Sequence, residues 1–124
     1  MAPIYLKDTQ KYGRGIYAKR DIKKGEQIEV SPIIMISKED WQKYLEKTIL
    51  YSYCFYWEEN LAIALGYGSL FNHSYHPNAR FYNNMANLSI DFYAIRDIKK
   101  DEEITINYHG DPEDDSPLWF DVIE

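Results

Sequence analysis

Short runs of apolar residues, separated by turn residues, dominate the chain. Such runs lie at residues 27–30 and 33–36 around Ser31-Pro32, at 53–57 and 61–65 around 58–60, and at 78–83 and 88–94 around 84–87. Runs of this length, bounded by Pro, Asn and acidic residues, are typical of strands joined by hairpins. The pattern predicts a mainly β fold with little helix.

One stretch follows the helical period. Ser37 and the three residues after it have the form of a capping box, and Trp41, Tyr44, Leu45 and Thr48 follow at spacings of three and four. A capping residue ahead of this spacing favours a helix. We therefore expect one helix over residues 38–50.

Residues 17–28 and 93–104 repeat one pattern. Nine of the twelve positions are identical, including an Arg-Asp-Ile-Lys-Lys run. The residue directly after this run is Gly25 in the first copy and Asp101 in the second. Two copies are too few for a solenoid. They predict two equivalent strand-turn-strand corners.

Composition limits the chain to one soluble domain. At 124 residues, 45% hydrophobic and 16% aromatic, it can bury a core of its own. Its 20 acidic and 14 basic side chains give a net charge of −6, which argues against direct nucleic-acid binding and leaves a locally cationic protein partner open. Tyrosine is in surplus, with 12 Tyr against 5 Phe.

The single cysteine, Cys54, excludes an internal disulfide and suits a reducing compartment. No secretory leader and no run of about 18 apolar residues is present, so we expect no membrane span and an intracellular location, cytoplasmic if the source is prokaryotic. His73 and His76 are three residues apart and His109 is distant, which fits no zinc pattern. We expect no metal site.

Three segments carry the candidate chemistry. They are Gly13-Arg14-Gly15, the dense run at residues 66–78 with Asn72-His73-Ser74 at its centre, and the β-branched strand 102–108 that ends in Tyr108. Taken singly, each has a plain structural reading: a turn, a loop whose side chains satisfy its own backbone, and an ordinary strand. It is their order along the chain that is informative.

In that order the segments resemble the SET-domain protein lysine methyltransferases, and among them the minimal stand-alone viral and prokaryotic type. The resemblance covers about residues 13–108. It implies short β-sheets, a knot-like threading of the C-terminal segment, and transfer of methyl groups from S-adenosylmethionine to a lysine ε-amine of a protein.

The resemblance also assigns roles to residues. The cofactor would be bound by Gly13, Arg14, Gly15, Asn72, His73 and Tyr108. We add Trp119, which the family pattern does not assign, as a residue that would stack over the cofactor. Tyr108 and Tyr53 would be the catalytic tyrosines that align the amine. Tyr53, Phe81 and Ile106 would line the lysine channel, and because Ile106 stands where the family often has a bulky aromatic residue, we expect di- or trimethylation.

The chain departs from the family after the last motif. The cysteine-rich segment that usually closes the channel is absent. We therefore divide the chain into a SET domain at residues 1–108 and an acidic tail at 109–124, in which Trp119 and Phe120 form an aromatic lid or simply dock on the core.

Two other functions remain open at this point. A catalytically weak SET-like module would bind lysine or methyl-lysine peptides through its tyrosines, as an aromatic cage does, and a structural or dimerisation module would use exposed aromatic residues. For the enzyme, the acidic balance suits a target lysine in a basic segment, and the resemblance allows a homodimer.

Overall fold

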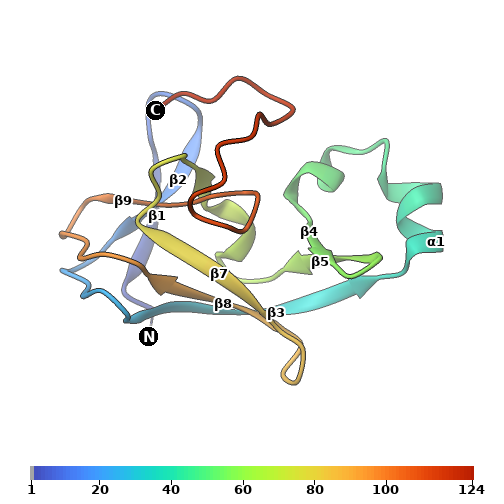
Figure 1. Ribbon diagram of the computed structural model, residues 1–124, viewed down its shortest axis with the longest axis horizontal. Helices are drawn as coiled ribbons and strands as arrows, with labels where there is room; N and C mark the ends of the chain where they lie inside the picture. The colour runs from blue at the N-terminus through green and yellow to red at the C-terminus, as the bar shows by residue number, and fades with distance from the viewer. Residues whose placement is uncertain (1) are drawn as a thin grey trace.

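The computed structural model describes residues 2–124, which form two β-sheets with little helix (Figure 1). The first sheet has the order β1-β2-β9-β6 and the second the order β4-β5-β3-β8-β7. The strands are β1 Ile4–Asp8, β2 Arg14–Ala18, β3 Gln27–Ile36, β4 Phe55–Trp57, β5 Asn60–Ala64, β6 Asn72–His73, β7 Ala79–Asn84, β8 Ser89–Ala94 and β9 Glu103–Ile106. The predicted fold class is confirmed. Within residues 2–124 no helix is long and apolar enough to cross a membrane.

The C-terminal strand β9 is inserted between elements from both halves of the chain. It pairs antiparallel with β2 and parallel with β6. Alternation along β9 buries Ile104 and Ile106 completely. This insertion brings the segment after β9 beside β6, where the sequence motifs meet.

The helical segment differs from the single helix expected. Ser37 does cap it, accepting a hydrogen bond from the Asp40 amide at 3.3 Å, but α1 Lys38–Asp40 passes at once into the π-helix η1 Trp41–Leu45 and then the 3-10 helix η2 Ile49–Tyr53. None of these elements contains a buried residue. A regular helix takes most of its stability from packing of an apolar face, and this segment packs none into the core.

The two strands expected at residues 27–30 and 33–36 are one continuous strand, β3. Its first part, up to Pro32, pairs with β8, and its second part, from Ile33, pairs with β5. Pro32 therefore lies where β3 changes partners. A proline is tolerated there because its missing N–H falls at a break in the ladder rather than inside it.

The two copies of the repeat pack against each other. Ile22 and Ile98 exchange both backbone hydrogen bonds, at 2.7 and 2.8 Å, and both side chains are buried. Each corner also contains an ion pair, Arg20 with Glu26 and Arg96 with Glu102. The predicted corners are thus equivalent in structure as well as in sequence, and they form one local two-fold contact.

Candidate active site

Two cavities adjoin where β6 and the end of β9 meet. The larger one, about 1050 Å³, is lined mainly by aromatic side chains from β4, β7 and the tail. The smaller one, about 180 Å³, is lined by Tyr12, His73 and residues 121–123 among others. Asn72, Tyr108 and Phe120 line both. These three residues therefore form a wall shared by the two cavities.

Tyr108 is held in this wall from both ends. Its backbone N–H donates to His73 Nδ1 at 2.9 Å, and its hydroxyl donates to the Phe71 carbonyl at 2.7 Å. Burial, with smaller contributions from Tyr53 and Glu103, raises the pKa of Tyr108 to about 12. The phenol is therefore neutral near pH 7, and its oxygen keeps lone pairs that can accept a hydrogen bond.

Asn72 connects the three motifs. Its Nδ2 donates to the Arg14 carbonyl and to Glu103 Oε2, both at 2.9 Å. Gly15 makes this contact possible, since a Cβ there would lie 2.5 Å from Glu103 Oε2 and 2.8 Å from Asn72 Nδ2. The glycine-rich turn, the Asn-His pair and the last strand thus meet around one amide.

His73 has an unsatisfied donor. Because its Nδ1 accepts the Tyr108 N–H, the proton of the neutral ring lies on Nε2, which is buried and has no hydrogen-bond partner. Burial, and then the nearby His109, lower the pKa of His73, with Glu124 opposing them. A buried N–H without a partner is costly. An acceptor on a ligand in the smaller cavity, which His73 lines, would satisfy it.

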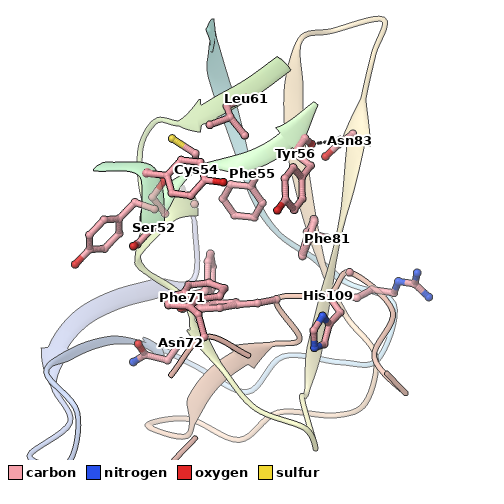
Figure 2. Close-up of a pocket in the computed structure, with 18 of the residues that line it drawn as sticks. Ser52, Cys54, Phe55, Tyr56, Leu61, Phe71, Asn72, Phe81, Asn83 and His109 are labelled. Atoms are coloured by element: carbon pink, nitrogen blue, oxygen red, sulfur yellow. Dashed lines mark hydrogen bonds between the residues drawn. The ribbon is translucent and has the colours of Figure 1, made fainter. Parts of the chain in front are cut away.

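Tyr53 and Phe81 both line the larger cavity, as expected for channel residues. Phe81 packs edge to face on Phe55 with ring centroids 5.0 Å apart, and Figure 2 shows these two rings close together, with Phe71 below them. Tyr53 is the last residue of η2 and is 46% exposed.

Ile106 does not lie where the sequence placed it. Its side chain is completely buried in the core and is not part of the cavity lining. The reason is the alternation of β9, which points Ile104 and Ile106 into the core. The predicted di- or trimethylation, which rested on Ile106, therefore has no support from the shape of the cavity.

The glycine-rich turn approaches the site only through its backbone. Gly13 has a φ of +91°, a conformation that favours glycine, and the Arg14 side chain is exposed. Neither these residues nor Gly15 lines either cavity. Their contact with the site is the Arg14 carbonyl bound by Asn72.

The tail returns to the site. Trp119 is 66% exposed and stacks on Tyr108, with ring centroids 6.2 Å apart, and Phe120 contacts Tyr108 and His73. Further along, the Glu124 carboxylate accepts hydrogen bonds from Ser74 Oγ at 2.6 Å and the Tyr75 amide at 3.0 Å. Of the two predicted lid residues, Phe120 is thus part of the shared wall, whereas Trp119 lines only the larger cavity. Glu124 fixes the tail beside them.

Sequence reasoning missed Tyr12 and Glu103. The Tyr12 hydroxyl donates to Glu103 Oε1, and burial together with this bond raises the pKa of Tyr12. Tyr12 directly precedes the glycine-rich turn and Glu103 lies within the last motif, so each was adjacent to a recognised signal. Nothing in the sequence shows that the two side chains meet.

Residues 2–124 contain no cluster of three or more His, Cys, Asp or Glu side chains arranged to hold a metal ion. Cys54 lines the larger cavity, and its Sγ donates to the Leu50 carbonyl at 3.2 Å. Burial raises the pKa of its thiol. Such a thiol is a poor nucleophile at neutral pH.

The fold is mainly β, and a partly buried tyrosine lies at the junction of two cavities with an Asn-His pair beside it. The chain belongs to the SET domain family, which matches residues 13–109. This membership, with the relatives below, confirms the predicted enzyme class, protein-lysine methyltransferase.

Two curated relatives are similar to the chain. A histone-lysine N-methyltransferase of Schizosaccharomyces pombe, specific for H3 lysine-37, is 39% identical over 121 residues, which are 97% of this chain and 78% of the relative. A variant-silencing SET domain-containing protein of Plasmodium falciparum is 35% identical over 85% of this chain, but the match covers only 5% of that protein.

Two solved structures share the fold. A candidate histone methyltransferase of Plasmodium falciparum is 32% identical, with a TM-score of 0.69 over 87% of this chain and 94% of that one. A humanized mutant of the Polycomb Repressive Complex 2 of Chaetomium thermophilum is 23% identical, with a TM-score of 0.70 over 86% of this chain and 15% of that one. The second likeness concerns the fold alone.

Proposed function

We propose that this enzyme transfers methyl groups from S-adenosylmethionine to a lysine ε-amine of a protein, with the cofactor in the smaller cavity and the lysine in the larger. The observation that carries the proposal is the shared wall of Asn72, Tyr108 and Phe120. A cofactor and a lysine that enter from opposite sides of Tyr108 would meet in line beside its hydroxyl. Such positioning lowers the barrier of a reaction between two molecules.

The smaller cavity suits the cofactor chemically. His73 Nε2 offers a buried donor without a partner, and Asn72, which donates to the Arg14 carbonyl, also lines the cavity. When bound there, S-adenosylmethionine supplies a methyl group activated by a sulfonium. The cavity, at about 180 Å³, is below the range of about 300–1,000 Å³ usual for ligand pockets. Residues 121–123 form part of its lining, so they would move outward on binding.

The larger cavity suits a neutral lysine. A free lysine has a pKa of about 10.4 and attacks only after losing its proton. The rings of Phe55, Phe71 and Phe81 line the cavity, and an apolar environment disfavours the ammonium form. The Tyr108 and Tyr53 oxygens would accept hydrogen bonds from the amine and orient its lone pair.

For the substrate, we propose a lysine in a basic segment of an intracellular protein, histones included. The relative from Schizosaccharomyces pombe is named for a histone lysine. A net charge of −6 favours approach of a cationic segment over long distances.

Tyr108→Phe tests the proposal. The hydroxyl that holds Tyr108 to Phe71 and orients the amine is removed, while the ring remains. We expect radiolabelled methyl transfer to histone proteins to fall by about 100-fold or more, and calorimetry to give a cofactor dissociation constant within about twofold of wild type.

Tyr44→Phe is the matched control, because Tyr44 is 66% exposed and lines neither cavity. It should leave transfer and binding unchanged. Full transfer by the Tyr108 variant, or failure of the unaltered protein to bind S-adenosylmethionine, would contradict the proposal.

A further inference from the structure

Arg80 is the one formally charged side chain among the residues that line the larger cavity, within the described part of the chain. It lies on β7, an edge strand of the five-stranded sheet. β4, the strand at the other edge, also lines the cavity. The Asn83 side chain on β7 contacts β4 by donating to the Tyr56 carbonyl at 2.9 Å (Figure 2). A cation at this position stands beside any peptide that lies along the edge of β7.

The Arg80 guanidinium is not neutralised. Arg20 and Arg96 each have a glutamate partner, whereas no carboxylate among residues 2–124 lies within 4 Å of Arg80. Its Nε is buried and has no hydrogen-bond partner. The chain has 20 acidic residues, so the lack of a partner does not come from a shortage of carboxylates.

The guanidinium is nevertheless held in place. Its Cζ lies 4.6 Å from the centre of the Tyr82 ring, and Tyr82 in turn contacts Tyr93 across the sheet. Stacking on an aromatic face fixes the plane of an arginine without using its N–H donors. Arg80 is thus an oriented fork of donors, one of them already desolvated.

Strand alternation relates Arg80 to the target lysine. Phe81 packs toward Phe55 and Phe92, on the inner face of β7. Arg80 and Tyr82 therefore lie on the opposite face. In an extended peptide placed along the free edge of β7, a lysine that points to the Phe81 side has its two immediate neighbours on the Arg80 side.

We propose that Arg80 binds the carboxylate of an Asp or Glu residue immediately next to the target lysine, and so determines which lysine is methylated. This inference rests on the proposed function. A planar guanidinium pairs with a carboxylate through two parallel hydrogen bonds, and it repels a neighbouring lysine or arginine. The overall negative charge of the chain still attracts a basic segment from a distance. Arg80 then favours, among the lysines of that segment, one with an acidic neighbour.

The test uses three synthetic peptide pools with a central lysine, random outer positions, and Glu, Gln or Lys fixed on both sides of the centre. Wild type should methylate and bind the Glu pool about tenfold better than the Gln pool, because a hydrogen bond to a charged group is worth about that factor. Arg80→Gln should remove this preference, so that the Glu and Gln pools are bound and methylated equally. Arg80→Glu should prefer the Lys pool.

Arg20→Gln is the control, since it removes an arginine that already has its partner. It should keep the preference for Glu. Binding measured by fluorescence anisotropy separates this inference from the proposed function: a Glu preference in binding without methyl transfer supports the role of Arg80 and contradicts the activity. Equal binding of the Glu and Gln pools, or a preference that survives in Arg80→Gln, would overturn the inference.

Discussion

At Gly15, side chains from two distant strands fill the space that any larger residue would need. An added Cβ would lie within 3 Å of Glu103, Asn72 and Thr9. The glycine is therefore required for side-chain packing, in addition to any approach of a ligand to the backbone. Since Asn72 belongs to the shared wall, a displacement of its side chain would change the shape of both cavities.

Gly15→Ala should consequently weaken the site as well as the fold. Overpacking of this kind costs about 1–3 kcal/mol, and displacement of Asn72 should raise the dissociation constant for S-adenosylmethionine. Urea unfolding and calorimetry measure the two effects.

Gly13→Ala provides the comparison. A Cβ at Gly13 meets nothing within 4 Å, so only its backbone conformation is strained, at a cost of about 1 kcal/mol. Cofactor affinity should remain normal. If both variants bind the cofactor as tightly as wild type does, the contact of Gly15 with Asn72 does not contribute to cofactor binding.

For single residues, functional positions can be predicted from the sequence where they belong to a motif. They cannot be predicted where their role depends on which residues the fold brings next to them. Asn72, His73 and Tyr108 could be singled out because their order along the chain is distinctive. Arg80 could not, because its lack of a partner depends on which carboxylates the fold brings near it. Ile106 was misplaced because a motif fixes a position in the chain and not the face on which a side chain lies.

Among the elements, the tail is fixed at its end by the Glu124 carboxylate. Glu124 accepts bonds from Ser74 and Tyr75, directly after the Asn-His pair. Partial burial acts to raise the pKa of Glu124, but these two hydrogen bonds, together with the nearby His76 and His73, outweigh it and lower the pKa overall. The ionised carboxylate is thus the form that fastens the tail.

Glu124→Gln should loosen the tail at neutral pH. Because the folded-state pKa is lowered, the contribution of Glu124 is present above the ordinary carboxyl pKa and is lost as the pH falls through the lowered value. We expect about 1 kcal/mol or less in urea unfolding at pH 7, given the exposure of the site, and a difference from wild type that shrinks in acid.

The same variant tests the lid. Residues 121–123 line the smaller cavity, so release of Glu124 should raise the dissociation constant for S-adenosylmethionine. Glu113→Gln should have no effect, because this carboxylate is exposed and makes no side-chain hydrogen bond within residues 2–124. Unchanged affinity in Glu124→Gln would show that the tail only docks.

The elements themselves were predictable where local pattern decides them. The hairpins at β4-β5 and β7-β8 follow from alternation and turn residues. The segment after Ser37 was predicted as one helix because its spacing is helical, yet a spacing says nothing about whether a surface exists to bury the apolar side. The continuity of β3 through Pro32 depends on its change of pairing partner from β8 to β5. This change of partner cannot be predicted from the sequence either.

At the scale of the whole molecule, the repeated corners connect the two ends of the domain. The Lys24 amide donates to Asp97 Oδ1 and the Lys100 amide donates to Asp21 Oδ1, each at 2.9 Å. The repeat itself could be read from the sequence. That the copies contact each other could not, because equivalent segments need not be neighbours.

Asp21→Ala and Asp97→Ala should have equal effects. Each removes one of the two matching hydrogen bonds, and we expect each to lower the free energy of unfolding by about 1 kcal/mol. Asp115→Ala, in the tail, should change it little. Urea unfolding measures all three, and a clear difference between the first two would show that the corners are not energetically equivalent.

The paired corners also set the order of events during synthesis. Ile22 and Ile98 must meet to complete the core, and β2 obtains its second neighbour only from β9. Contacts between residues so far apart in sequence form slowly, since a long loop must close before they stabilise anything. The apolar surface of the N-terminal hairpin, β1 and β2, therefore stays exposed until β9 has left the ribosome. During this interval a chaperone would protect the nascent protein.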